Sequence, residues 1–60
     1  MTKEDAEHHA VAWGEAYMCL CDDRSKWHHT GDEYARRTQA ILIADAAHRG
    51  YMKLAEALDK

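Results

Sequence analysis

Hydrophobic side chains recur at steps of three and four residues along both halves of the chain. The stripe in the first half comprises Ala6, Ala10, Trp13, Tyr17, Leu20, Arg24 and Trp27, and only Arg24 breaks its apolar character. The stripe in the second half comprises Tyr34, Ile41, Ala44, His48, Tyr51, Ala55 and Leu58. This spacing places the members of each stripe on one face of an α-helix. The pattern therefore predicts two amphipathic helices and an all-α fold.

The only dense run of helix-breaking and capping residues, at positions 28–32, lies between the two stripes. A turn at this point predicts an antiparallel two-helix hairpin and a single domain over residues 1–60. Folding the chain about Gly31 brings residues whose numbers sum to about 62 to the same height. Trp13 then lies opposite residues 47–50, so that a large ring faces small side chains.

Two glycines lie within the predicted helices. We interpret Gly14 and Gly50 as making room for aromatic rings across the hairpin; the alternative is that each interrupts its helix. Glycine costs about 1 kcal/mol in a helix interior, so a second helix that ended at Gly50 would leave residues 51–58 as a short third helix. One continuous second helix is the preferred interpretation.

The helix ends are predicted from their capping residues. Thr2 followed by acidic residues is typical of a helix that begins at about Lys3. Two histidines and Gly31 favour an end near His29, with Gly31 in a left-handed cap; the alternative is a stop near Asp22 and a loop over residues 23–30. Thr30 and Glu33 have the spacing of a capping box, which predicts that the second helix begins there.

A second apolar stripe lies about 100° from the first one on the second helix. It comprises Ala40, Ile43, Ala47, Gly50, Leu54 and Ala57. Two helices cannot bury both stripes, whereas two hairpins packed through this face make a four-helix bundle. The predicted homodimer interface comprises Val11, Met18, Ile43, Ala47, Gly50 and Leu54. The alternatives are a monomer with this face in water, and a face that binds a different protein.

Charge and composition narrow the function classes. Eight basic and eleven acidic residues give a net charge of −3, which does not favour nucleic-acid binding. The longest apolar run, residues 40–44, is far shorter than the roughly 18 residues of a membrane span. No leader pattern opens the chain, and two cysteines make no disulfide framework. We expect a cytoplasmic protein that does not bind membranes.

Cys19, Cys21, His28 and His29 are the candidate metal ligands, because thiolates and imidazoles bind zinc. On a helix, residues two apart diverge by about 200°, so the two cysteines cannot share a metal there. We therefore expect neither a metal nor a cofactor, and keep a metal-binding or redox-sensitive module as the second hypothesis. Catalysis by Cys21, His28 and Asp22 would need a pocket that two helices do not offer, so we expect no enzyme. His48, on the packed stripe, is interpreted as a hydrogen-bonded core residue.

Two sets of segments resemble known helical proteins. Residues 10–13 with Tyr17, and then residues 31–35, resemble a single hairpin of the tetratricopeptide family, whose modules bind partner peptides; the 34-residue period of that family is absent. Residues 46–48 and 54–58 are similar to short helical proteins of actinobacteria and their phages. The sequence as a whole predicts a small protein–protein interaction module, a homodimeric regulatory or accessory factor, with a further protein partner that these residues do not identify.

Overall fold

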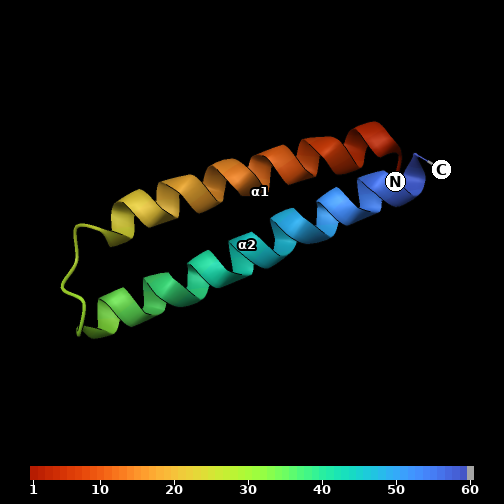
Figure 1. Ribbon diagram of the computed structural model, residues 1–60. Coiled ribbons are helices and arrows are strands. Elements are labelled where there is room, and N and C mark those ends of the chain that lie inside the picture. Colours follow the sequence, from red (N-terminus) through yellow and green to blue (C-terminus); the bar gives the residue numbers. More distant parts are fainter. Residues whose placement is uncertain (60) are drawn as a thin grey trace.

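The computed structural model describes residues 1–59, which form two α-helices joined by a short loop. Helix α1 comprises Lys3–Arg24 and helix α2 comprises Asp32–Leu58. The helices lie side by side and antiparallel, with the start of α1 and the end of α2 at the same end of the hairpin (Figure 1). No strand occurs within residues 1–59, so the predicted all-α hairpin is confirmed.

Helix α1 begins with a capping box. The Thr2 side-chain oxygen accepts a hydrogen bond from the Asp5 main-chain N–H at 3.2 Å, and the Asp5 carboxylate accepts one from the Thr2 N–H at 3.4 Å. Each side chain thereby satisfies a donor that the first turn of a helix leaves without a partner. The predicted start at Lys3 is confirmed.

Helix α1 ends at Arg24, so the predicted end near His29 is wrong and the alternative stop near Asp22 is closer. Ser25 caps the helix, and its hydroxyl donates to the Asp22 carbonyl oxygen at 2.6 Å. A serine hydroxyl competes with the helical hydrogen-bond pattern in this way. Beyond the cap, the chain no longer follows the helix, and the Trp27 ring packs against the guanidinium of Arg37 on α2.

The start of α2 also differs from the prediction. Gly31 is the N-cap and makes no side-chain hydrogen bond, so the predicted capping box of Thr30 and Glu33 is wrong. The Thr30 hydroxyl instead lies 2.9 Å from Nδ1 of His28. Gly31 has φ −84°, so the left-handed cap predicted there is wrong as well. Glu33 pairs with Arg37 one turn further along α2.

Helix α2 is continuous through Gly50, and a separate third helix does not form within the described residues. The position that a Cβ atom would take on Gly50 has open space around it, so Gly50 makes no room for a ring in the hairpin and that prediction is wrong. Gly14 does lie against a ring. A Cβ atom there would be 3.1 Å from two ring atoms of His48.

The predicted register of the hairpin is confirmed by pairs of residues in contact across it. The numbers in each of the pairs Lys3–Asp59, Gly14–His48 and Arg24–Thr38 add up to 62. Tyr51, which the register places opposite residues 10–14, stacks on His9 with ring centroids 4.9 Å apart. The turn therefore sets the relative height of the two helices as the sequence indicates.

The buried core between the helices is small. The buried side chains are Ala6, Ala10, Ile41, Ala44 and Ala55. Four of these five contribute only a methyl group, so the hydrophobic stabilisation of one hairpin is modest. The chain exposes 4661 Å². A compact protein of this mass would expose about 4,000 Å². The extents of 45 × 13 × 12 Å describe a rod with much of its apolar surface outside.

Candidate interaction surfaces

The two sides of the hairpin follow from the direction of the helices. Each helical residue turns by about 100° from the one before it. Because α1 and α2 are antiparallel, all residues that directly follow a hairpin-facing residue lie on the same side of the hairpin, whichever helix they belong to. Val11 follows Ala10 and Met52 follows Tyr51, and Val11 and Met52 line a common groove. Residues that precede a hairpin-facing residue lie on the opposite side.

Four of the predicted interface residues lie together on that opposite side, which we call the α2 stripe. Each of them immediately precedes a member of the hairpin-facing stripe of α2. The α2 stripe comprises Ile43, Ala47, Gly50 and Leu54. Its two large side chains are exposed, at 61% for Ile43 and 38% for Leu54. On α1, small residues flank the stripe, because Ala12 and Ala16 also precede hairpin-facing residues.

The other two predicted interface residues lie on the groove side. Val11 follows Ala10 and Met18 follows Tyr17, and both line the groove rather than the α2 stripe. The structure therefore does not bring the six residues together on one face. The interface stays a prediction; on α1, residues 12 and 16 rather than Val11 and Met18 lie on the side of the α2 stripe, because both helices turn in the same sense along the chain.

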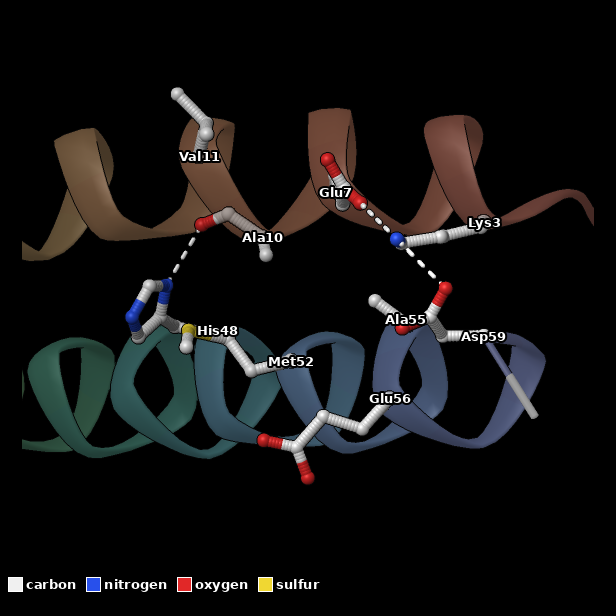
Figure 2. Close-up of a pocket in the computed structure, with 9 residues that line it drawn as sticks. All are labelled: Lys3, Glu7, Ala10, Val11, His48, Met52, Ala55, Glu56 and Asp59. Atoms are coloured by element: carbon white, nitrogen blue, oxygen red, sulfur yellow. Dashed lines mark hydrogen bonds and ion pairs between the residues drawn. The ribbon is translucent and has the colours of Figure 1, made fainter.

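The groove consists of two open hollows of about 330 and 440 Å³ that meet at Val11 and His48. We call their combined surface the acidic groove. The first hollow is lined by Lys3, Glu7, Ala10, Val11, His48, Met52, Ala55, Glu56 and Asp59 (Figure 2). The second is lined by Val11, Gly14, Glu15, Tyr17, Met18, Asp45 and His48. The acidic groove is therefore an exposed apolar strip with carboxylates along its edges.

His48 fixes the middle of the groove. Its Nδ1 lies 2.6 Å from the Ala10 carbonyl oxygen, and because a carbonyl only accepts, Nδ1–H is the donor. The ring fits against Gly14, where a side chain would crowd it. The predicted hydrogen bond of His48 is confirmed, but its placement in the core is wrong, because the side chain is half-buried and lines both hollows of the groove. This contact holds the walls of the groove at a set separation.

The charges of the groove are mostly negative. Glu7, Glu15, Asp45, Glu56 and Asp59 supply five carboxylates against one ammonium. That ammonium, on Lys3, lies 2.8 Å from Asp59 and 3.7 Å from Glu7. The hydrogen bond and charge of Asp59, followed by the charge of Glu7, raise the pKa of Lys3. Among the described residues that line the groove, Lys3 is the one cation, and Asp59 and Glu7 already engage it.

An ion-pair cluster closes the loop end of the hairpin. Nε of Arg37 lies 2.6 Å from an Asp23 carboxylate oxygen, and the same guanidinium pairs with Glu33 and lies 4.2 Å from the centre of the Trp27 ring. Hydrogen bonds to Asp23, and then to Glu33, raise the pKa of Arg37. This cluster joins α1, the loop and α2.

The four candidate metal ligands are placed separately. Cys19 is exposed and Cys21 half-buried, and neither is in a disulfide. The His28 imidazole contacts Thr30, whereas the His29 ring lies 5.2 Å from the Tyr34 ring. Within residues 1–59 no three histidine, cysteine or acidic side chains form a group suited to a metal ion. The Cys21 thiol, one turn from Tyr17, raises the pKa of that phenol.

No protein-family model matches this chain, and no curated protein or solved structure matches it at a significant level. Across the described residues, neither helix has an apolar stretch long enough to cross a bilayer. Function is therefore inferred from the two surfaces of the hairpin.

Proposed function

We propose that this protein is a small helical interaction module that self-associates through the α2 stripe, so that two hairpins form a four-helix bundle. The observation that carries the proposal is that Ile43 and Leu54 stand exposed on one face of α2, with the small Ala47 and Gly50 between them. Small residues at the centre of such a stripe let a second helix approach closely.

The small core supports association. A chain of about 60 residues usually needs a disulfide, a metal or a second subunit to offset the cost of ordering it. Here the fully buried side chains of the described residues are the methyl groups of Ala6 and Ala44, no large side chain is fully buried, and both cysteines are free. Packing two α2 stripes together would bury Ile43 and Leu54 from each copy and give the bundle one shared core.

The sizes of the stripe residues favour a second copy over a different protein. About a twofold axis between Ala47 and Gly50, Ile43 of one copy faces Leu54 of the other. Ala47 then faces Gly50, and Ala40 faces Ala57 at the two ends of the second apolar stripe. In every pair the residue numbers add up to 97. Large side chains thus meet large ones and small meet small across antiparallel α2 helices. A surface that complements itself in this way is what a twofold dimer requires.

The dimer would leave the acidic groove of each hairpin on the outside. A regulatory or accessory factor acts through such surfaces rather than through chemistry of its own. The role of the dimer is then to present two identical surfaces to other proteins.

The experiment is a mass measurement by sedimentation equilibrium over a range of protein concentrations. We expect the wild type to form a dimer and Leu54→Glu to remain near 6.9 kDa, because the substitution would place carboxylates in a dry interface. Leu42→Glu is the matched control, since Leu42 is 60% exposed and lies off the stripe. A wild type that stays monomeric, or a Leu54→Glu variant that stays dimeric, would refute the proposal.

A further inference from the structure

We infer that the acidic groove is a docking site for a basic amphipathic helix of another protein. The site lies on the side of the hairpin opposite the α2 stripe, so the inference goes beyond self-association and does not depend on it. The occupant would place apolar side chains against Val11, Met18 and Met52, and lysine or arginine side chains against the carboxylates at the edges.

The apolar strip of the groove is exposed along its whole length. Val11 is 59% exposed, Met18 71% and Met52 48%. Figure 2 shows Val11 on α1 and Met52 on α2, with the His48 ring between the two helices. Methionine side chains are flexible and adapt to different apolar partners, which is common at surfaces that receive helices.

The length of the groove suits a short helix. Its lining on α1 extends from Lys3 to Met18. At about 1.5 Å per residue this span is roughly 22 Å, which a helix of about four turns would fill. Residues of the occupant at helical spacing would meet the strip at successive turns, as in other helix-in-groove complexes.

The charges decide which occupant fits. Carboxylates of Glu7 and Glu15 come from α1, and those of Asp45, Glu56 and Asp59 from α2. Lys3 pairs with Glu7 and Arg49 pairs with Asp45, so within the described residues each edge still carries more acids than bases. A second copy of this chain docked through the same groove would bring like charges together, which disfavours it. Phosphate-bearing nucleic acid and anionic lipid are disfavoured for the same reason. A helix with lysines beside its apolar face is complementary to both the strip and the edges.

The groove is also formed in advance. The hydrogen bond from His48 to the Ala10 carbonyl oxygen and the close fit of the ring against Gly14 hold α1 and α2 together at its centre. A partner therefore loses little free energy in ordering the site.

The test uses a labelled 15-residue helical peptide with leucines on one face and lysines beside them, measured by fluorescence anisotropy. A peptide with every lysine replaced by glutamate serves as the comparison. We expect only the lysine peptide to bind, and its affinity to fall as salt is raised. Equal binding of the glutamate peptide, or no binding of either peptide, would overturn the inference.

Variants locate the site. Glu15→Gln with Glu56→Gln should weaken binding by roughly fivefold for two exposed ion pairs lost. Asp22→Gln with Asp32→Gln changes the net charge equally away from the groove, and should have no such effect. Val11→Ser should weaken binding, whereas Ile43→Ser, at a residue of equal exposure on the opposite side of the hairpin, should not. Equal effects of groove and control variants would show attraction by net charge alone and refute a docking site.

Repeating the titration with Leu54→Glu separates this inference from the dimer. We expect the peptide to bind the monomeric variant as it binds the wild type. Binding by a wild type that is itself monomeric would uphold the docking site while the proposed dimer failed. If Val11→Ser rather than Leu54→Glu abolished self-association, the groove would be the dimer face and the docking site would be refuted.

Discussion

His48 on α2 donates a hydrogen bond from Nδ1 to the main-chain carbonyl oxygen of Ala10 on α1, at 2.6 Å. The bond crosses the middle of the hairpin, where the neighbouring buried side chains are alanines. It links the two helices where the buried side chains are small, and the His48 ring lines both hollows of the acidic groove.

Loss of this bond should destabilise the hairpin. We expect His48→Ala to lower the free energy of unfolding by about 1 to 2 kcal/mol, because a cross-helix hydrogen bond and the packing of a ring are both removed. Urea unfolding followed by circular dichroism, at one fixed protein concentration, measures the change. Ala46→Ser, on an exposed part of α2, is the control and should leave the midpoint nearly unchanged. An unaltered midpoint for His48→Ala would contradict the structural role of the bond.

The two helical glycines should respond differently to alanine. Alanine is a better helix former by about 1 kcal/mol, and at Gly50 its methyl group enters open space, so Gly50→Ala should stabilise the isolated hairpin. At Gly14 the methyl group would lie 3.1 Å from the His48 ring, which cannot withdraw without stretching its bond to Ala10. Gly14→Ala should therefore not raise the stability of the wild type, but it should raise the stability of a variant in which alanine replaces His48. Thermal unfolding in the Leu54→Glu background, which we expect to be monomeric, measures each change.

The capping residues give a prediction that depends on pH. Thr2→Ala should lower stability by about 1 kcal/mol at neutral pH, whereas Thr30→Ala should have little effect because Thr30 caps no helix. Hydrogen bonds from the Thr2 side chain and backbone lower the pKa of Asp5 below its ordinary value of 3.8. A lowered folded pKa stabilises the fold above the unfolded pKa, and this contribution is lost as the pH falls through the folded value. The difference between wild type and Thr2→Ala should therefore narrow in acid, and a constant difference down to pH 2 would contradict the Asp5 interaction.

Metal titration tests the second functional hypothesis. Cobalt added to the reduced protein should give no thiolate charge-transfer band and no large rise in melting temperature. The reason is that Cys19 and Cys21 diverge around α1 while the His29 ring packs beside Tyr34. Stoichiometric tetrahedral cobalt binding would reverse this conclusion and support a metal-binding module.

Much of the fold could be predicted from the sequence because it depends on local pattern. The stripes of apolar residues fix which faces meet, and the short turn fixes the register seen at Lys3 and Asp59. The end of α1 could not be read in this way. Arg24 donates to the Thr38 hydroxyl at 3.1 Å and lies over the Tyr34 ring, and such contacts between helices do not appear in the periodicity of either one.

The side of the hairpin on which Val11 and Met18 lie is a different case. The sequence contains the information needed, because in an antiparallel pair the residues that follow each hairpin-facing position share a side. Glu7, Val11 and Met18 on α1 obey this rule together with Met52 and Glu56 on α2. Applied to the sequence, the rule would have separated the acidic groove from the α2 stripe. The sizes of the α2 stripe residues, with large opposite large and small opposite small, can also be read from the sequence.

Disulfide cross-linking tests the antiparallel packing of two α2 stripes most directly. In a Cys19→Ser, Cys21→Ser background, cysteines replacing both Ile43 and Leu54 lie eleven positions apart on one helix, about 16 Å, too far to bond within a chain. We predict that mild oxidation gives a covalent species of twice the 6.9 kDa chain mass, and that neither single-cysteine variant does so efficiently. A double variant that stays monomeric, or an Ile43→Cys single variant that cross-links readily, would contradict the antiparallel dimer.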